Sequence, residues 1–312
     1  MDRGHARRLA ESLDEERLVW IMGSSRSGST WLLRMLSELP GAVAIDDPHI
    51  GHHLGVWRPI PLAWATAAER PELATLDRVK EEKPGYFFND AHAEVWRPLL
   101  RDLIAGRFAA QAATEAPGAV RAPLVVVKEP GAQAAEHLLS LFPRSRLVFL
   151  LRDGRDVVDS WLAAYQDGSW AQDEGAFPLA ERGREAFVRW QSAVWAYRTE
   201  AMGRAYAAHD PRRRVLVRYE SLLADPPSEL RRICRAASVR VPAEDLERIA
   251  ATYDFDGLPE ERKGEARETR AATPGAWREN LTIAEQRVVD EELGHVLRRF
   301  GYAEDRELAR AA

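Results

Sequence analysis

The chain has little cysteine, little lysine and no long apolar run. One cysteine, Cys234, among 312 residues excludes an intrachain disulfide and a cysteine-rich zinc site. No apolar run approaches the ~18 residues of a membrane span, and residues 1–17 are charged throughout, without a signal-peptide core. We therefore expect a soluble, cytoplasmic protein with no membrane contact. The 44 basic residues nearly balance the 49 acidic ones, which argues against a nucleic-acid partner.

Apolar runs alternate with segments of helical spacing. The runs at 17–23, 124–127, 146–151 and 215–217 predict buried strands, and a shorter strand is expected at 42–45. Helices are predicted at 29–39, 69–82, 91–109, 133–142, 153–165, 181–208, 226–237, 243–252 and 283–299, with a long charged loop at 254–276. This alternation predicts an α/β fold, a three-layer parallel sheet flanked by helices.

A Gly/Ser-rich loop joins the first strand to the first helix, in the residues Gly23-Ser24-Ser25-Arg26-Ser27-Gly28-Ser29-Thr30. In this context backbone N–H groups and a helix N-terminus converge on an anion. The spacing matches the Gly-x-x-x-x-Gly-Lys-Ser/Thr pattern except that Ser29 occupies the lysine position. That lysine serves the β and γ phosphates of a nucleotide, so its absence argues against an ordinary ATPase or kinase. Arg26 supplies a cation within the loop, which predicts a different anion.

The loop resembles the phosphosulfate loop of sulfotransferases that use 3′-phosphoadenosine 5′-phosphosulfate (PAPS), in the residues Arg26-Ser27-Gly28-Ser29-Thr30-Trp31. Carbohydrate and tyrosylprotein members have arginine at the position of Arg26. A second segment, Arg152 with Ser160 eight residues later, is similar to the 3′-phosphate motif of the family. The resemblance implies that Arg26, Ser27, Gly28, Ser29 and Thr30 hold the 5′-phosphosulfate, with Arg26 also contributing to catalysis, and that Arg152 and Ser160 hold the 3′-phosphate.

Four further segments resemble parts of the same family. Lys128, at the end of the second apolar run, is one of only four lysines, and the resemblance gives it the role of stabilising the leaving group. Tyr219, after the fourth run, and Trp31 would line the adenosine. Lys263, Arg278 and Arg262 resemble C-terminal elements of the family, and the sequence leaves open which of them reaches the 3′-phosphate.

The best candidate for the catalytic base is Asp47, in Asp46-Asp47-Pro48. Tyrosylprotein sulfotransferases similarly carry two acids after this helix and use the second as the base. An Asx-type turn is the alternative interpretation. Glu129, His49, His52 and His53 are rival bases, because no histidine of the cytosolic type follows Lys128. We expect no metal, since these histidines lack helical spacing and a cysteine partner.

The resemblance implies a P-loop NTPase-like sulfotransferase fold in a single domain over 1–312, with a variable, acceptor-side insertion at 46–110. The charged N-terminal residues 1–16 are expected to form a polar helix or a flexible segment. The expected reaction is in-line transfer of a sulfuryl group from the co-substrate PAPS to a hydroxyl of a small molecule. A phenol, a sugar and a specialised metabolite all fit, and the insertion supplies aromatic residues for an acceptor pocket. The alternatives are a P-loop kinase or NTPase with a displaced cation and an inactive nucleotide-binding module. The sequence leaves the oligomeric state open.

Overall fold

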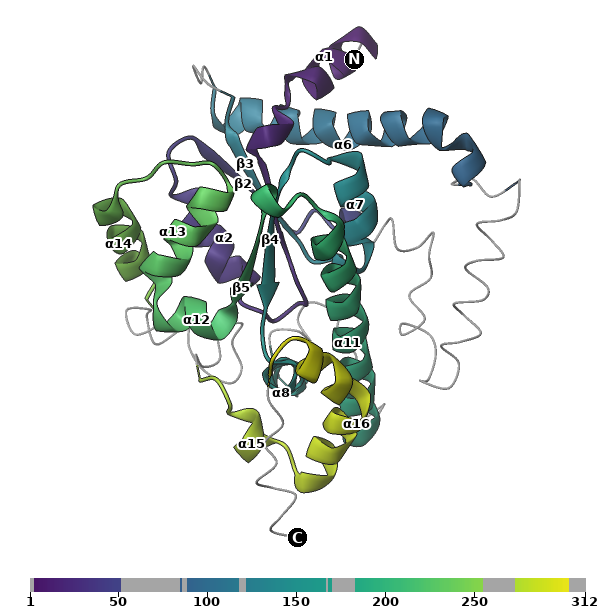
Figure 1. The fold of residues 1–312 in the computed structure, drawn as a ribbon, viewed down its shortest axis with the longest axis vertical. Helices are drawn as coiled ribbons and strands as arrows, with labels where there is room; N and C mark the ends of the chain where they lie inside the picture. The colour runs from purple at the N-terminus through teal and green to yellow at the C-terminus, as the bar shows by residue number, and fades with distance from the viewer. Residues whose placement is uncertain are drawn as a thin grey trace.

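The protein is built on a parallel sheet between two layers of helices (Figure 1). The computed structural model describes residues 3–51, 85, 89–117, 122–166, 168–169, 183–254 and 273–302. The strands are β1 (Leu18–Met22), β2 (Ala42–Asp46), β3 (Leu124–Glu129), β4 (Arg146–Leu151) and β5 (Arg214–Arg218). They pair in the order β2-β3-β1-β4-β5, and every neighbouring pair is parallel. The predicted α/β fold class is confirmed.

Burial along the strands follows their place in the sheet. Every residue of the central strands β1, β3 and β4 is buried, because helices cover both faces of the sheet there. The edge strands β2 and β5 alternate between buried and partly exposed residues. Continuous apolar runs in the sequence therefore marked the centre of the sheet.

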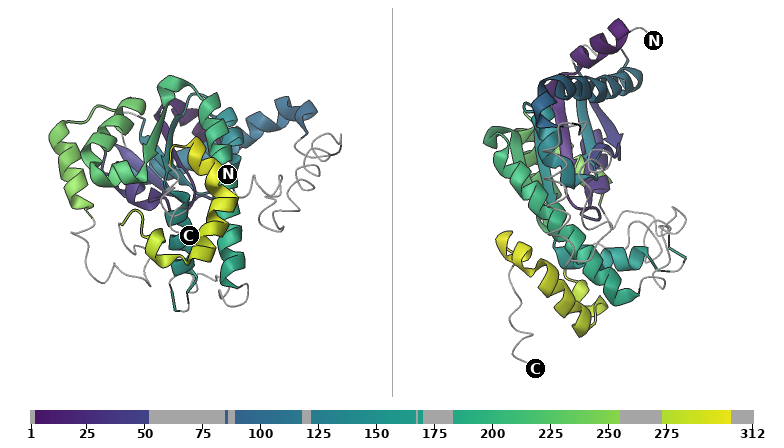
Figure 2. Two further views of the ribbon diagram at one scale, coloured as in Figure 1. Left: turned by 60° about the horizontal axis from the view of Figure 1, so that its bottom comes forward. Right: turned by 90° about the vertical axis from the view of Figure 1, so that its right-hand side faces the viewer.

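Helices of both halves of the chain cover the two faces. One face packs under α6 (Ala93–Glu115), α7 (Ala135–Leu141), α8 (Gly154–Ala164), α11 (Arg184–Ala208) and α16 (Ile283–Arg299), with α1 (Arg3–Ser12) against α6. The other face packs under α2 (Ser29–Ser37), α12 (Tyr219–Ala224), α13 (Pro226–Ala236) and α14 (Ala243–Thr252). Figure 2 shows α6 at one end of the molecule and α15 (Trp277–Asn280) with α16 at the other.

Several element boundaries differ from the sequence prediction. The α6 helix runs to Glu115 rather than ending near 109, because the alanine-rich stretch after Phe108 continues the helix as far as the residues before Pro117. The short helices α12 and α15 were not predicted. The predicted helix at 69–82 and most of the predicted loop at 254–276 lie outside the described residues.

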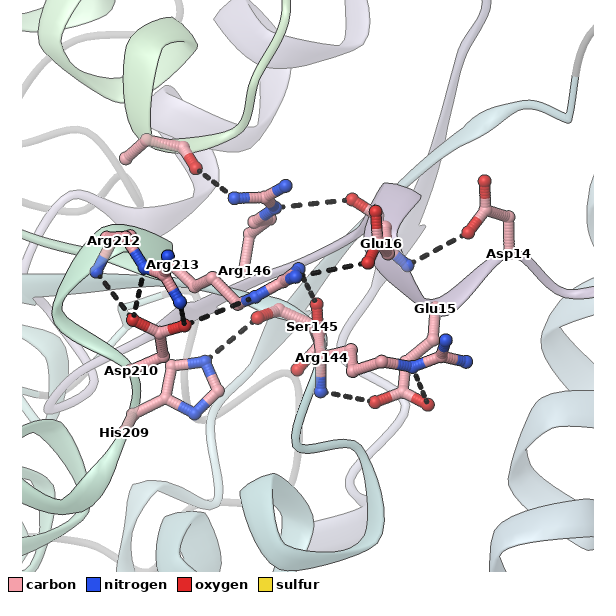
Figure 3. Close-up of polar contacts among 11 residues, drawn as sticks. Asp14, Glu15, Glu16, Arg144, Ser145, Arg146, His209, Asp210, Arg212 and Arg213 are labelled. Atoms are coloured by element: carbon pink, nitrogen blue, oxygen red, sulfur yellow. Dashed lines mark hydrogen bonds and ion pairs between the residues drawn. The ribbon is translucent and has the colours of Figure 1, made fainter.

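A polar network joins the segments that lead into the amino ends of β1, β4 and β5 (Figure 3). The Glu15 carboxylate accepts hydrogen bonds from the backbone N–H of Arg144 and from Arg101. Arg213 donates to Glu16 and to the carbonyl oxygen of Arg144. Because all five strands are parallel, their carboxyl ends lie together at the opposite edge, where ligands bind in open α/β sheets.

Candidate functional site

The loop at 23–30 links the carboxyl end of β1 to α2. Gly28 caps α2 with φ +85°, a left-handed conformation, and provides no side-chain acceptor for the first N–H groups of the helix. Arg26 also has a positive φ, +68°, which costs an ordinary residue about 1–2 kcal/mol. The Ser27 hydroxyl donates to the carbonyl oxygen of Ser24 and closes the loop. This tight turn leaves N–H donors available at a helix N-terminus, an arrangement that suits an anion.

Both glycines of the loop are required by close contacts. A Cβ atom on Gly28 would lie 2.7 Å from Cδ2 of Tyr219, at the start of α12. A Cβ atom on Gly23 would overlap the carbonyl oxygen of Leu150 in β4. The loop is therefore pressed against β4 and α12, and its shape depends on the absence of side chains at these two positions.

Two arginines and one serine of the predicted phosphate sites lie together around the loop. Arg152 follows β4, donates from Nη1 to the carbonyl oxygen of Arg26 at 3.0 Å, and stacks 4.5 Å from the centre of the Tyr219 ring. Arg26 donates from Nε to the hydroxyl of Ser160 on α8 at 3.1 Å. The Nε atom of Arg152 is buried and has no hydrogen-bond partner among the described residues. Two guanidinium groups therefore lie around the loop, and one N–H donor of Arg152 has no partner among the described residues.

The two aromatic residues predicted at the adenosine site are neighbours. The rings of Trp31 and Tyr219 lie 6.2 Å apart in an edge-to-face arrangement. The indole N–H of Trp31 donates to the carbonyl oxygen of Tyr253, which fixes the orientation of the ring.

Lys128 is held between the loop and the carboxyl end of β2. Its ammonium group donates to the Thr30 hydroxyl at 2.8 Å and pairs with Asp46 at 2.7 Å and Asp47 at 2.9 Å. The side chain of Lys128 is only 8% exposed, whereas that of Asp47 is 41% exposed. One positive charge faces two carboxylates, so the group keeps a net negative charge beside the loop.

Asp47 differs from Asp46 in two respects. Its φ is +45°, a left-handed conformation, and its backbone N–H donates to the carbonyl oxygen of Lys128. Its Oδ2 atom pairs with Lys128, but its Oδ1 atom is buried without a hydrogen-bond partner among the described residues. This oxygen therefore has unused capacity to accept a hydrogen bond.

Glu129, a rival candidate for the base, fixes local structure. Its carboxylate accepts hydrogen bonds from the backbone N–H groups of Ile50 and Gly131, and its side chain is buried. Burial, with a smaller contribution from the negative charge of Asp47, raises the pKa of Glu129 to about 7. Both carboxylate oxygens are occupied by backbone donors, whereas Asp47 has an unpartnered oxygen. Of the rival histidines, His49 is described and has a left-handed backbone, while His52 and His53 lie outside the described residues.

A buried carboxylate of α8 holds the C-terminal segment near the site. Asp156 accepts hydrogen bonds from the backbone N–H groups of Gly275 and Trp277, and burial raises its pKa. The guanidinium groups of Arg155 and Arg278 both lie over the Trp277 ring, at 4.3 and 4.7 Å from its centre. Arg278 is therefore on the segment attached to the same helix as Ser160. Lys263 and Arg262 lie outside the described residues.

The sequence did not predict that a third arginine contacts the loop. Arg198 of α11 donates from Nη1 to the hydroxyl of Ser25 at 3.3 Å, and burial lowers its pKa to about 10. The sequence carries only a weak signal for it: no carboxylate stands three or four residues away on either side, where an exposed helical arginine often has an ion-pair partner.

No group of histidine, cysteine, aspartate and glutamate among the described residues could hold a metal ion. Likewise, none of the described helices is long and apolar enough to span a membrane.

The chain is similar to known proteins both in sequence and in fold. A family model described as the sulfotransferase family matches residues 19–243. The structure is similar to the sulfotransferase STF9 from Mycobacterium avium, with a TM-score of 0.52 and 17% identity over 94% of this chain and 79% of that one. It is also similar to mouse sulfotransferase SULT7A1 complexed with PAP, with a TM-score of 0.52 and 11% identity over 96% of this chain and 90% of that one. No curated protein matches the sequence.

Proposed function

Because the chain belongs to the sulfotransferase family, we propose that it transfers a sulfuryl group from PAPS to a hydroxyl of a small-molecule acceptor. The observation that carries this proposal is the positively charged cluster around the 23–30 loop, where Arg26, Arg152 and Ser160 lie in direct or shared contact. The unpartnered Nε atom of Arg152 fits a phosphate ligand, since a buried guanidinium donor without an acceptor is costly.

The donor would span the carboxyl edge of the sheet. Trp31 and Tyr219 would line the adenosine, Arg152 and Ser160 would bind the 3′-phosphate, and Arg26 with the loop N–H groups would bind the 5′-phosphosulfate. Ser27, Gly28, Ser29 and Thr30 complete the loop site. Arg278, and Lys263 from outside the described residues, are proposed contributors to the 3′-phosphate site. The stacking of Arg278 on the tethered Trp277 supports its assignment.

The proposed mechanism is an in-line displacement at sulfur. The acceptor oxygen forms a bond to sulfur, the bond between sulfur and the bridging oxygen of the 5′-phosphosulfate breaks, and Asp47 takes the acceptor proton on Oδ1. The electron pair of the broken bond stays on the bridging oxygen, where the positive charge of Lys128 stabilises it. The contact of Lys128 with Thr30 supports this role, because it holds the ammonium group beside the first turn of α2.

Ligand-induced stabilisation tests the choice of nucleotide. We expect 3′-phosphoadenosine 5′-phosphate (PAP) to raise the Tm strongly, since a ligand at a hundred times its Kd stabilises the folded state by about 2.7 kcal/mol. ATP with Mg²⁺ should leave the Tm unchanged. Stabilisation by ATP with Mg²⁺ and not by PAP would instead favour a kinase or NTPase with a displaced cation.

Turnover separates an enzyme from an inactive nucleotide-binding module. A panel of phenols, sugars and other hydroxylated metabolites incubated with radiolabelled PAPS should yield a labelled product. With that acceptor, Lys128→Ala should lose turnover while its Kd for PAP remains close to that of the wild type. Binding of PAP without turnover on any acceptor would support the inactive module.

A further inference from the structure

Arg198 approaches the 23–30 loop from a different element than the other cations of the site. Figure 1 shows α11 running beside β4 and continuing past its carboxyl end to α8 and α16, in agreement with the contacts between these elements. This path brings Arg198 to Ser25, the third residue of the loop, with Nη1 3.3 Å from the hydroxyl.

The charge of Arg198 is not neutralised by any carboxylate among the described residues. The other three arginines of α11 each have one: Arg184 pairs with Glu285, Arg189 with Glu292 and Arg204 with Glu136. The Nε atom of Arg198 is buried and has no hydrogen-bond partner in the described parts of the chain. Its pKa is lowered by burial alone. Arg198 is partly exposed as a whole, but a guanidinium with a buried N–H donor and no counter-charge favours the binding of an anion.

Neighbouring groups on α11 add further unpartnered polar atoms. The indole N–H of Trp195 and the hydroxyl of Thr199 lie within one turn of Arg198, and both are buried without a hydrogen-bond partner among the described residues. Trp195 packs at the start of α8, where a Cβ atom on Gly154 would touch its ring. Unpartnered polar atoms of α11 therefore lie within one turn of Arg198 along the helix.

We propose that Arg198 binds the oxygens of the sulfuryl group that is transferred. This inference rests on the proposed function. In that proposal the adenosine lies over β4 and β5, and the base Asp47 follows β2 at the opposite edge of the sheet, so the sulfuryl group lies between them, at the carboxyl ends of β3 and β1. Arg152 is directed to Tyr219, on the adenosine side, and Arg26 donates to Ser160 while it serves the 5′-phosphosulfate in the proposed function. Ser25 and Arg198 take part in neither of these contacts and meet at the beginning of the loop, directly after β1.

The chemistry assigned to Arg198 is electrostatic. As the bond between sulfur and the bridging oxygen breaks and the bond to the acceptor oxygen forms, the three peripheral sulfuryl oxygens keep their negative charge. A fixed guanidinium can donate two N–H groups to them without gaining or losing a proton. Arg198 would thus act as an arginine supplied by the same chain to the transferred group.

The matched ligands PAP and PAPS test this assignment, because they differ only in the sulfuryl group. Calorimetry without an acceptor would measure both Kd values for the wild type and for Arg198→Met. We expect the variant to bind PAPS about tenfold or more weakly while its Kd for PAP stays the same, and to lose about 10²-fold or more in kcat. Equal weakening of both ligands, or weakening of neither, would overturn the proposal. A wild type that binds neither ligand would instead refute the proposed function.

Three variants separate binding from a structural role. Arg204→Met removes an exposed, ion-paired arginine from the same helix and should leave both Kd values unchanged. Ser25→Ala removes the contact of Arg198 with the loop but keeps the positive charge, so the ratio of the two Kd values should remain that of the wild type. If Ser25→Ala changed this ratio as much as Arg198→Met does, Arg198 would act by supporting the loop. Arg198→Lys retains a charge should the methionine variant not fold, and an intermediate ratio is expected for it.

Discussion

Two adjacent aspartates share one lysine, yet the structure distinguishes them. Asp46 and Asp47 both pair with Lys128, so electrostatics alone would make them interchangeable. Only Asp47 has a buried Oδ1 atom without a partner among the described residues. Its left-handed backbone places this oxygen, and aspartate and asparagine tolerate that conformation better than most residues. The pair therefore offers a controlled test of the base.

Asp47→Asn should lower kcat by about 10²–10⁴-fold, because the amide cannot accept the acceptor proton. The Kd for PAP should stay near the wild-type value, since the proposed contacts to the nucleotide are made by other residues. The matched control is Asp46→Asn, which also removes one carboxylate from Lys128. A comparable loss of kcat in both variants would show that the charge around Lys128 matters and that Asp47 is not the base.

Gly28 is a second position where a single atom determines the site. Gly28→Ala introduces a Cβ atom 2.7 Å from the Tyr219 ring and imposes a left-handed conformation on alanine. We expect a loss of more than about 1–2 kcal/mol in the free energy of unfolding and a clearly weaker affinity for PAP, measured by urea titration and calorimetry. Gly41→Ala is the control, because Gly41 also has a positive φ but no atom lies within 4 Å of its Cβ position. Equal effects of the two substitutions would contradict the importance of the Tyr219 contact.

At the scale of elements, α8 joins the proposed 3′-phosphate site to the C-terminal part of the chain. Asp156, in the first turn of α8, accepts two backbone N–H groups from the segment that carries Trp277. Ser160 lies one turn further along the same helix and contacts Arg26. The α8 helix thus contacts both the loop after β1 and the segment that carries Trp277, which lies more than a hundred residues further along the chain than α8.

Asp156→Asn should destabilise the protein by about 1–3 kcal/mol, because the amide can accept only one of the two backbone N–H groups and leaves the other buried without a partner. The Kd for PAP should rise as well if Arg278 contributes to the 3′-phosphate site. Asp159→Asn is a suitable comparison, since Asp159 is buried on the same helix but accepts from the side-chain amide of Asn280. A change in stability without any change in the Kd for PAP would separate the tether from the ligand site.

The elements also show which parts of the molecule the sequence predicted. Strands such as β1 and β4 were predictable because a strand that is buried on both faces has a continuous run of apolar residues in the sequence. The edge strand β5 extends one residue beyond its predicted run at each end, since its terminal residues Arg214 and Arg218 are partly exposed and polar. The loop at 23–30 was recognisable because its glycines and Arg26 are consecutive. Arg198 was not, because its contact with Ser25 spans 173 positions and carries no local pattern.

At the scale of the whole molecule, the net charge of −5 describes neither edge of the sheet. The carboxyl edge gathers Arg26, Arg152 and Arg198 around the loop. The amino edge pairs acids with arginines, as in the contact of Glu16 with Arg213 (Figure 3). The net charge is thus an average over two edges whose local arrangements of charge differ. A group at the amino edge should also make stability depend on pH.

His209 is a titrating group at the amino edge of the sheet. It is buried, its Nε2 atom lies 2.8 Å from the carbonyl oxygen of Ser145, and burial lowers its pKa despite the opposing effect of Asp210. The guanidinium groups of Arg213 and Arg214 act in the same direction as burial. The folded protein therefore keeps His209 neutral at a pH where the unfolded chain takes up a proton.

The stability that His209 contributes should accordingly be present above about pH 6.5 and be lost as the pH falls below it, through the lowered pKa of the folded state. Glu129 acts in the opposite sense, because its raised pKa of about 7 makes the folded state hold a proton that the unfolded chain releases. The pH dependence of the wild-type free energy of unfolding therefore contains both contributions, and a variant is needed to isolate one.

His209→Gln keeps a donor for the carbonyl oxygen of Ser145 but does not titrate. Urea unfolding at about pH 7.5 and about pH 5.5 should show a larger loss of stability toward acid in the wild type than in the variant. Identical losses in the two proteins would show that His209 is not protonated on unfolding in this range.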